Sequence, residues 1–139
     1  RWWRMKGAGQ NWDNDMPPAR FIKMTTYNLK RDKSSDFFRF WGNNVKLQKS
    51  LGYSGVSGVF MLESGGQAYQ VMEVEAYNSH AEGKGALKNP DVNYIEEYNK
   101  MFGWRSHRND QAAFNAAIEQ WGITIETAEL KPEMSSKLK

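Results

Sequence analysis

His80 is the side chain in this sequence best suited to acid–base chemistry, because imidazole has a reference pKa of about 6.5 and exchanges protons at neutral pH. It follows a strand-like segment and lies in the stretch Ser79–Glu82, whose S-x-x-E pattern is typical of a helix start. We therefore predict His80 as a general base at the mouth of a pocket, with a solvated residue at a helix start as the alternative. His107 lies in the polar segment RSHRND and is expected on the surface.

Polar groups at the ends of the expected strands are the next candidates. Asn28 and Tyr27 lie near the end of the first strand, and Tyr77 ends the third. An amide or a phenol in these places could orient a phenolic or carbonyl oxygen of a substrate. The catalytic set that we predict is His80 as the base, Asn28 as the group that positions oxygen and Tyr77 as a hydrogen-bond donor. Hydrogen bonding at the edge of the core is the alternative role for Asn28 and Tyr77.

Aromatic and soft side chains are predicted to line the same pocket. The sequence holds six Trp, six Tyr and seven Phe, and rings dominate both protein cores and ligand sites. The residues that we expect to bind a ligand are Tyr27, Trp41, Met72 and Tyr98. Core packing is the alternative. A filled space between sheet and helices would exclude an enzyme, whereas a cavity that contains His80 or Asn28 would support one.

Other kinds of chemistry have little support in the sequence. Two separated histidines and no cysteine give no metal-ligand spacing and no disulfide, so we expect no metal. The glycine pairs match neither phosphate-binding motif, and no cofactor is expected. Glu73 and Glu75 share one strand face, and Glu96 and Glu97 share a helix turn. We expect these carboxylates to be solvated or to lie at a dimer interface, because acid–base work requires a pocket that separates their pKa values.

Length and charge narrow the class of protein. A chain of 139 residues fits one domain with a core of its own. Residues 1–50 hold eleven Lys and Arg against four Asp and Glu, whereas residues 51–139 hold eight against twelve. The basic residues are scattered, which argues against a nucleic-acid partner, and no apolar stretch approaches the ~18 residues of a membrane span. We expect a soluble protein, with the cytoplasm favoured but the compartment unknown, because the lack of cysteine neither requires nor excludes an oxidising compartment.

Periodicity predicts four strands and the helices between them. Alternating residues indicate strands, and apolar residues three and four positions apart indicate helices. The predicted strands are 21–30, 56–63, 68–77 and 123–130. The predicted helices run from Ser34 or Ser35 to about Leu51, from Pro90 to Phe102, and from Asn109 or Asp110 to Trp121. In the third strand, Met72, Val74 and Ala76 make the face that we expect to be buried.

These elements give the order β-α-β-β-α-(α)-β, which predicts an α+β protein. The expected architecture is a ferredoxin-like split βαβ fold with a four-stranded antiparallel sheet and helices on one face. The domain extends over 21–131, with an extra helix near 110–121. Residues 1–20 form a Trp-rich arm without a regular period, which we expect to be irregular and to pack on the domain or on a partner subunit. Residues 132–139 form a polar tail.

The segment from Phe21 to Lys131 resembles the antibiotic-biosynthesis-monooxygenase-like superfamily of dimeric α/β barrels. The resemblance is carried by the strand FIKMTTYN, the helix segment DFFRFWGNNVKLQKSLGY with GVSGVFML after it, the segment VMEVEAYNSHAEGKGAL and the helix NPDVNYIEEYNKMF. It implies that two protomers pair through their sheet faces, and that each has a pocket between its sheet and its helices. The superfamily includes cofactor-free oxygenases that act on electron-rich aromatic molecules, haem-degrading enzymes, isomerases and proteins with no known activity.

The haem-degrading branch of this superfamily uses an Asn on the first strand, a Trp at the end of the third and a His on the second helix. This chain has Asn28 and Tyr77 near the first two positions, and Glu97 near the third. Because an imidazole ligand is missing from the second helix, the resemblance does not extend to haem binding, and the expected cofactor remains none.

Two classes of function fit these features. The first is a small-molecule-binding dimeric α/β barrel, acting as a cofactor-independent monooxygenase-like enzyme or an isomerase on a small apolar or aromatic substrate. In the oxygenase version, a base removes a substrate proton and the resulting carbanion reduces O₂. The second is a non-catalytic binding or assembly module that docks a partner through its Trp-rich arm and extra helix. A homodimer through the sheet face is the expected assembly.

Overall fold

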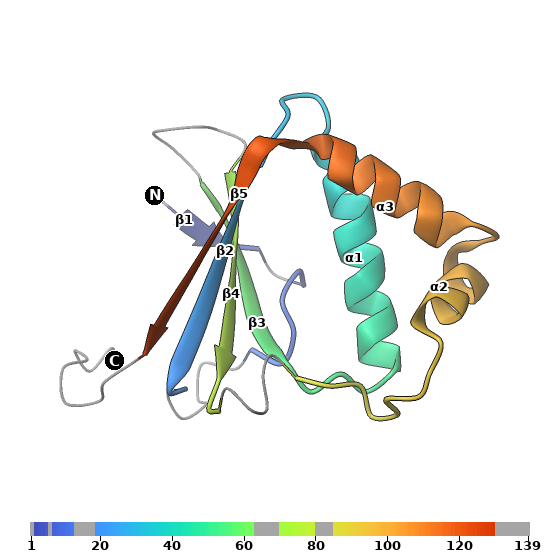
Figure 1. Ribbon diagram of the computed structural model, residues 1–139, viewed down its shortest axis with the longest axis horizontal. Helices are drawn as coiled ribbons and strands as arrows, with labels where there is room; N and C mark the ends of the chain where they lie inside the picture. The colour runs from blue at the N-terminus through green and yellow to red at the C-terminus, as the bar shows by residue number, and fades with distance from the viewer. Residues whose placement is uncertain (1, 6, 13–18, 63–69, 80–84, 130–139) are drawn as a thin grey trace.

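The computed structural model describes residues 2–5, 7–12, 19–62, 70–79 and 85–129. Five strands form one antiparallel sheet in the order β1-β3-β4-β2-β5 (Figure 1). The strands are β1 (Trp2–Arg4), β2 (Phe21–Leu29), β3 (Val56–Leu62), β4 (Gln70–Tyr77) and β5 (Ile118–Glu129). The helices are α1 (Ser34–Ser50), α2 (Tyr94–Phe102) and α3 (Ser106–Ala117), and all of them lie on one side of the sheet.

The strand order defines the fold class. Helix α1 connects β2 to β3, a hairpin connects β3 to β4, and α2 and α3 connect β4 to β5. Strands β3, β4, β2 and β5 are neighbours in that order, and each pair is antiparallel. This is the ferredoxin-like split βαβ arrangement. The predicted α+β class and the predicted four strands are therefore confirmed.

The N-terminal arm adds a fifth strand that the sequence pattern did not indicate. Trp2–Arg4 forms β1 and pairs with Phe60, Met61 and Leu62 at the edge of β3. The expectation of an irregular arm is wrong for these residues. A three-residue strand is too short to show alternation, so its structure depends on the unpaired edge that β3 offers. The described part of the arm packs on its own domain, because Gln10 also pairs with Ser57 of β3.

The pairing register separates two faces of the sheet. On the inner face, toward the helices, Tyr27 of β2 lies opposite Val71 of β4, which lies opposite Met61 of β3. The outer face carries half-buried side chains, most of them apolar: Ile22, Met24, Val56, Phe60, Met72, Val74 and Ala76. The prediction that Met72, Val74 and Ala76 form the buried face is wrong, because the helices cover the opposite face, where Val71 is fully buried.

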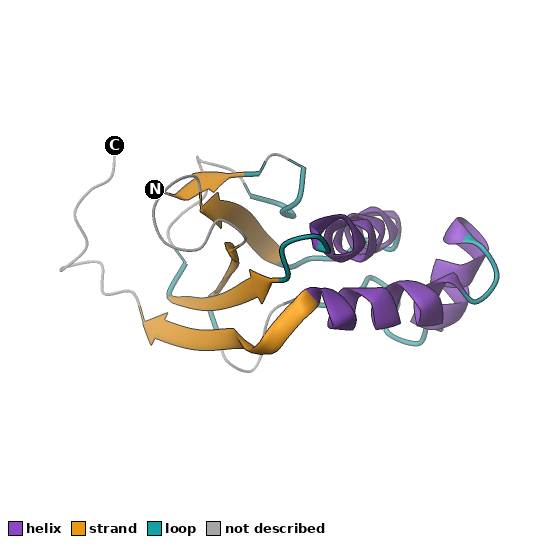
Figure 2. Ribbon diagram, turned by 90° about the horizontal axis from the view of Figure 1, so that it is seen from above, coloured by secondary structure: helices purple, strands orange, loops and turns teal. Residues whose placement is uncertain are grey.

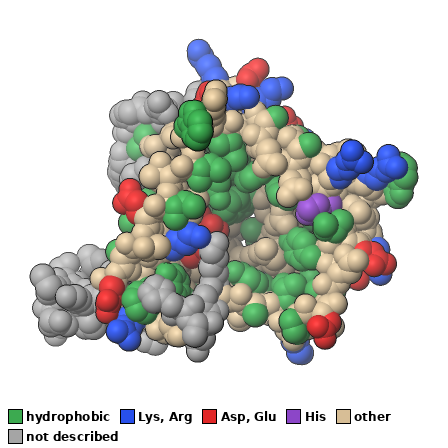
Figure 3. Space-filling model, in the orientation of Figure 1, with side chains coloured by type: hydrophobic (Ala, Val, Ile, Leu, Met, Phe, Trp, Pro, Cys, Tyr) green, Lys and Arg blue, Asp and Glu red, His purple; other side chains and the backbone are tan. Residues whose placement is uncertain are grey.

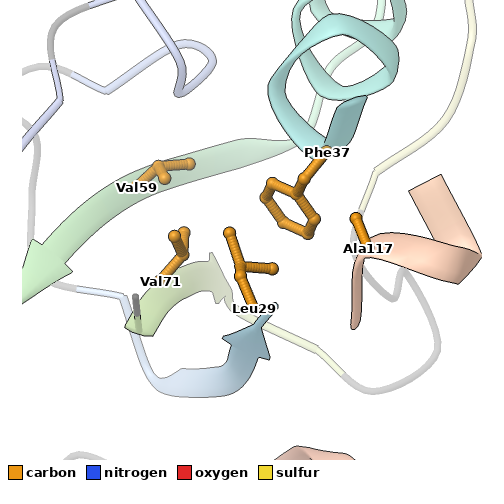
Figure 4. Packing of buried hydrophobic residues seen from close by; sticks show 5 residues of the cluster. All are labelled: Leu29, Phe37, Val59, Val71 and Ala117. Atoms are coloured by element: carbon orange, nitrogen blue, oxygen red, sulfur yellow. The ribbon is translucent and has the colours of Figure 1, made fainter. Parts of the chain in front are cut away.

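The core lies where the helices meet one end of the inner face. Phe37 of α1 packs against Leu29, Val59 and Val71 of the sheet and Ala117 at the end of α3 (Figure 4). Phe37 is fully buried. Its ring also belongs to an aromatic cluster with Tyr27, Phe38, Trp41 and Phe114, with ring centroids between 4.7 and 5.6 Å from its own. This end of the domain is therefore held by one dense group of apolar side chains.

Helix α1 and the sheet diverge away from this core. Figure 1 shows α1 and the strands close together at the top, near Leu29 and Ser34, and further apart at the bottom, near Phe21 and Ser50. Figure 2, seen from above, shows the helices together on one side of the strands. The layers therefore form a wedge.

Helix α2 begins later than predicted. Asn93 caps it, with its side-chain oxygen accepting a hydrogen bond from the backbone N–H of Glu96 at 3.2 Å. Asn89, directly before the predicted start at Pro90, instead accepts from the N–H of Asp91 at 3.1 Å in a turn before the helix. The helix therefore starts one turn later than the proline suggested.

Helix α3 begins and ends earlier than predicted. Asn99 of α2 accepts hydrogen bonds from the N–H of His107 at 2.9 Å and from Ser106 Oγ at 3.3 Å, which fixes the start of α3. Residues 118–121, expected in the helix, belong to β5. The irregular register near Tyr27 requires Gly122, because a Cβ there would lie 2.7 Å from the Glu119 oxygen. Gly122 therefore serves a bulge in a strand instead of ending a helix.

Several predicted features lie outside the described residues. These are the turn at 64–67, His80 with most of its helix-start motif, the 132–139 tail and part of the arm at 13–18. Within the residues that the structure describes, no helix combines the length and apolar composition that a membrane crossing needs.

The core can be tested by truncating its central ring. Phe37→Ala should lower the free energy of unfolding by about 3–5 kcal/mol, because it removes a fully buried ring and leaves a cavity. Urea denaturation measures the change. Met101→Ala is the control: its side chain is exposed, so it should change stability by less than about 0.5 kcal/mol. Equal effects of the two substitutions would contradict this description of the core.

Candidate binding cavity

The wider part of the wedge contains a cavity of about 290 Å³. The molecular surface in Figure 3 is hollowed between the sheet and the helices. The cavity is lined by residues from the arm, from α1, from the inner face of the sheet and from α3: Ala8, Gln10, Phe40, Trp41, Asn44, Val45, Gln48, Ser57, Glu73 and Phe114. Half of these side chains are apolar and half are polar, which is the composition of a site that binds and orients a small molecule.

One wall of the cavity is aromatic. Trp41 stacks on the buried ring of Phe37, with centroids 5.6 Å apart, and so its position is set by the core. Phe40 and Phe114 pack against each other at 5.2 Å and link α1 to α3. Because these rings are held on both sides, the wall is rigid before any ligand arrives, and this lowers the entropy cost of binding.

Helix α1 also contributes two amides to the lining, next to this aromatic wall. Asn44 and Gln48 follow Trp41 at positions three and seven along α1, and therefore share its face of the helix. Asn44 donates to the Phe40 carbonyl at 2.8 Å and accepts a hydrogen bond from the Tyr94 hydroxyl. Burial raises the pKa of Tyr94 to about 12. The amide of Asn44 is thus held by both partners and cannot rotate freely.

The sheet also presents polar groups to the cavity. Along the inner face, the row of Tyr27, Val71 and Met61 is apolar. The next two rows toward Phe21 contain Thr25 and Glu73, and then Lys23, Glu75 and Ser57. Thr25, Ser57 and Glu75 are buried. Buried polar groups are costly unless they are paired, so this polar strip marks the part of the sheet that no apolar helix face covers.

The N-terminal arm closes the wedge. Gln10 forms an antiparallel bridge with Ser57, with backbone bonds of 3.0 and 2.9 Å. Trp41 Nε1 donates to the Ala8 carbonyl at 3.0 Å, and Gln10 Nε2 donates to Gln48 Oε1. Gly9 is required here, because a Cβ would lie 2.3 Å from the Ser57 oxygen. The arm therefore joins β3 to α1 and forms a wall of the cavity.

Gln10 supplies the least satisfied polar atom of the site. Gln10 is 5% exposed, and its Oε1 accepts no hydrogen bond from the residues that the structure describes. An unpaired buried carbonyl costs roughly 1–3 kcal/mol of stability. Gln10 itself is one of the residues that line the cavity.

Among the described residues that line the cavity, Glu73 is the one titratable side chain. Burial, together with the charges of Glu73 and Glu75, raises the pKa of the neighbouring Tyr27. Tyr27 therefore stays protonated and neutral at physiological pH.

The predicted site residues fall into separate places. Trp41 lines the cavity, and Tyr27 lies behind it, with its ring 5.9 Å from that of Trp41. Met72 lies on the outer face and cannot reach the space between sheet and helices. The expectation that these side chains line one pocket with Met72 is therefore wrong, because β4 presents Val71 and Glu73 inward instead.

The predicted catalytic set is not assembled by the described residues. Asn28 lies on the outer face, where its side chain accepts from Gln70 Nε2 at 2.9 Å. Tyr77 is at the opposite end of β4, on the inner face, stacked on Phe21 at 5.6 Å. Seven residues of strand separate the two positions, or roughly 23 Å at 3.3 Å per residue. His80 lies outside the described residues, so its predicted role stays a prediction.

Tyr98 and His107 belong to the interface between helices. Tyr98 is fully buried; its hydroxyl donates to Asp110 Oδ2 at 2.8 Å and accepts from Asn43 Nδ2 at 3.1 Å. Burial raises its pKa. His107 is half-buried, with its ring 5.1 Å from that of Tyr98 and 5.5 Å from that of Phe40. The expectation of a surface His107 is wrong, and Tyr98 does not line the cavity.

Sequence reasoning missed most of the cavity lining. The helical spacing of Trp41, Asn44 and Gln48 was a usable signal. It places two amides on the face of the helix that otherwise carries apolar residues and packs toward the sheet. The alternation along the strand was another usable signal: Glu73 lies two positions after Val71, so the two side chains share a strand face. For Gln10 no local signal exists, because its position depends on contacts of the arm with residues about forty positions later.

Metal chemistry gains no support from this arrangement. Within the described part of the chain, no cluster of three or more His, Cys, Asp or Glu side chains could hold a metal ion.

Fold and cavity together define a ferredoxin-like α+β protein with an aromatic and amide-lined site between sheet and helices. No family model matches the chain, and no curated protein matches it. Among solved structures, a NIPSNAP family protein from Agrobacterium tumefaciens aligns at 12% identity over 86% of this chain and 93% of its own, with a TM-score of 0.48.

Two further solved structures give the same picture. A NIPSNAP family protein with unknown function from A. tumefaciens aligns at 17% identity over 89% of this chain and 97% of its own, with a TM-score of 0.46. A NIPSNAP-like domain protein from Burkholderia xenovorans aligns at 11% identity over 88% and 94%, with a TM-score of 0.44. At this level of likeness the fold assignment rests on the strand order of the chain itself.

Tyr94, a half-buried tyrosine that bonds to the lining residue Asn44, should make the stability of the protein fall at alkaline pH. Because the pKa of Tyr94 is raised to about 12 from an ordinary value of about 10, the folded state binds its proton more tightly than the unfolded state. The stabilisation is complete below about pH 10 and is lost as the pH rises toward 12. Urea unfolding measured from pH 9 to 11.5 should show stability falling with pH, and Tyr94→Phe should make this fall shallower.

Tyr27 and Tyr98, whose pKa values are also raised, should keep part of the pH dependence in the Tyr94→Phe variant. An unchanged slope in that variant would contradict a raised pKa at Tyr94.

Proposed function

We propose that this protein binds a small molecule in the cavity between α1 and the sheet, with an aromatic or apolar body against Trp41, Phe40 and Phe114. The observation that carries the proposal is the meeting of an aromatic wall with buried polar residues, Gln10 and Ser57, at one partly enclosed place. A purely structural interior would hold apolar side chains there, since buried polar groups reduce stability when they lack partners.

The size of the cavity fits this role. At about 290 Å³ it lies near the lower end of the range of roughly 300–1,000 Å³ for ligand pockets. It therefore suits a molecule of one or two rings and not an extended cofactor. The aromatic wall favours a flat ring, and the amides of Gln10 and Gln48 favour a polar group at the other end.

A cofactor-free oxygenase reaction has less support than binding. The positions that the superfamily resemblance suggested, Asn28 and Tyr77, lie outside the cavity, and His80 is not among the described residues. We therefore propose a binding site. The oxygenase reaction and membership of the antibiotic-biosynthesis-monooxygenase-like superfamily are finer hypotheses beyond this proposal.

The assembly-module alternative is also less well supported. The described part of the arm packs on its own chain: Trp12 lies edge-on to Phe60 at 6.3 Å, and Ala8 and Gln10 contact α1 and β3. One feature still favours an assembly module, namely two exposed tryptophans that flank α3 in the sequence. Trp104 is 82% exposed and Trp121 is 92% exposed.

A single filling substitution tests the binding proposal. Indole, titrated into the protein and followed by calorimetry, should bind the wild type, because its ring matches the aromatic wall. Ala8→Trp places a large side chain in the cavity and should weaken indole binding by at least tenfold. The matched control is Ala112→Trp, at an exposed position of α3, which should leave the affinity unchanged.

Circular dichroism and thermal unfolding establish that both variants fold. Equal binding of indole to the Ala8→Trp and Ala112→Trp proteins, or no binding of indole to the wild type, would contradict the proposed site.

We further propose that two protomers pair through the outer face of the sheet. Its support is the band of apolar side chains there, including Ile22, Phe60, Met72 and Val74, on the side opposite the helices (Figure 2). Among the described residues, Trp12 covers part of this face, near Gly58 and Phe60. Apolar faces of this extent on soluble domains are typical of interfaces.

Sedimentation velocity tests the pairing. The wild type should sediment as a dimer at micromolar concentration, and Val74→Lys should produce a monomer, because it places a charge at the centre of the face. Ile125→Lys is the control, since Ile125 is 57% exposed and lies on the inner face of edge strand β5. A monomeric wild type, or a dimer that survives Val74→Lys, would contradict this interface.

A further inference from the structure

We propose that the turn between α2 and α3 binds the surface of a membrane that contains anionic lipids, with Trp104 in the headgroup region and Arg105 and Arg108 at the lipid phosphates. None of these three residues lines the cavity, so this is a binding activity beyond the proposed function. Three features carry the inference: an exposed aromatic ring, positive charge beside it, and a rigid support for both.

The exposed ring belongs to Trp104. It lies in the turn that Figure 1 shows at the edge of the molecule furthest from the sheet, and it is almost fully exposed. Its ring lines an open groove along α2 together with Ile95, another exposed apolar side chain. Tryptophan has an apolar body and a polar N–H group, and it is enriched where lipid meets water. Trp104 therefore suits that boundary.

Two arginines give this turn its positive charge. The guanidinium carbon of Arg105 lies 4.3 Å from the centroid of the Trp104 ring, and Arg108 follows in the first turn of α3. Both arginines are exposed, and neither forms an ion pair with the residues that the structure describes. Figure 3 shows Lys and Arg side chains beside hydrophobic ones at this end of the molecule. Their charge is thus available to anionic groups in solution or on a surface.

The helix that follows the turn adds to the positive potential. The first turn of α3 contains no acidic residue, although Asp and Glu are the side chains that stabilise a helix N-terminus. The partial positive charge of this helix end therefore adds to the charges of Arg105 and Arg108. Lys100 of α2 is paired with Glu96 and Glu97 at 3.7 and 3.3 Å. The three basic side chains of this region outnumber these two glutamates.

The turn is held firmly by the two helices that it connects. Asn99 of α2 accepts hydrogen bonds from the N–H of His107 at 2.9 Å and from Ser106 Oγ at 3.3 Å. Phe102, at the end of α2, packs against the buried ring of Tyr98 at 4.7 Å. Because both helices are fixed next to the turn, its exposed groups lose little entropy when they bind a surface.

An exposed ring alone does not define such a surface, as Trp121 shows. Trp121 is also almost fully exposed, but the groove that it lines contains Glu119 and no Lys or Arg. The carboxylate of Glu119 disfavours an anionic surface there. Trp121 therefore offers a matched control for Trp104 in the same chain.

Sedimentation of the full chain with lipid vesicles tests the inference. Vesicles of phosphatidylcholine with about 30% phosphatidylserine supply the anionic surface, and vesicles of phosphatidylcholine alone supply the neutral one. The protein should partition onto the anionic vesicles at least about tenfold more strongly. This binding should weaken as salt rises from about 0.05 to about 0.5 M, because salt screens the attraction. Equal partitioning onto both kinds of vesicle would overturn the inference.

Removal of two charges locates the surface. An arginine near an anionic membrane contributes about fivefold in affinity, so the double variant Arg105→Gln with Arg108→Gln should bind roughly twentyfold more weakly. The matched control is Lys30→Gln with Arg31→Gln, which removes two exposed charges from the loop before α1. It should change the affinity by less than about twofold, because this loop lies away from the α2–α3 turn (Figure 1).

Contact of Trp104 with the lipid is measured separately. Anionic vesicles with brominated acyl chains quench the fluorescence of a tryptophan that reaches the lipid, and the wild type should lose part of its emission on them. Trp104→Phe should still bind, because it keeps an aromatic ring, but it should lose the quenched part of the emission. Trp121→Phe should retain that part.

The remaining outcomes would overturn the inference, with circular dichroism used to establish that each variant folds. Full binding by the Arg105 and Arg108 variant would show that these charges do not hold the membrane. Quenching that persists in Trp104→Phe would place a different tryptophan in the lipid. Binding to polyglutamate, an acidic polypeptide, without binding to either kind of vesicle would show that the surface recognises an acidic protein.

Discussion

The rest of the structure depends on a change of polarity along the inner face of the sheet. Near Leu29 and Val71 this face is apolar, and Phe37 anchors helix α1 there. Toward Phe21 the rows carry Thr25, Glu73, Glu75 and Ser57, which an apolar helix face cannot cover without leaving polar groups unpaired. Helix α1 packs its Phe37 end against the apolar part of this face, and the two layers diverge toward Phe21, although Val45 and Leu47 further along the helix are also buried (Figure 1). The cavity is a consequence of this packing.

The N-terminal arm covers the wide part of the wedge between α1 and the sheet. Its backbone bridge to Ser57 and the hydrogen bond from Trp41 to the Ala8 carbonyl connect the two diverging layers at the wide part of the wedge. Polar atoms on both layers thereby gain partners, with Gln10 bonded to Gln48 across the space. The arm is thus part of the binding site, and any change in its position would alter the size of the cavity as well as its supply of acceptors.

Local sequence patterns predicted the strands and helices, whereas long-range packing determines which residues line the cavity. Alternation along Phe21–Leu29 and helical spacing from Ser34 were enough to identify β2 and α1, because both signals depend on neighbouring residues. The choice of buried face in β4 was wrong, since it depends on which side the helices cover, and Met72 and Glu73 look equally plausible without that knowledge. Gln10 could not have been found, because its place is fixed by residues far along the chain.

The most direct test of the binding site is a two-dimensional NMR titration of the wild-type protein with indole. The indole Nε1–H of Trp41 gives a signal that can be followed separately from the backbone, since the site holds that group against Ala8. We predict that Trp41 Nε1–H and the amides of Ala8, Gln10 and Gln48 shift together along one saturating curve. Shifts centred on the outer face, at Met72 and its neighbours, with these signals unmoved, would contradict a binding site between α1 and the sheet.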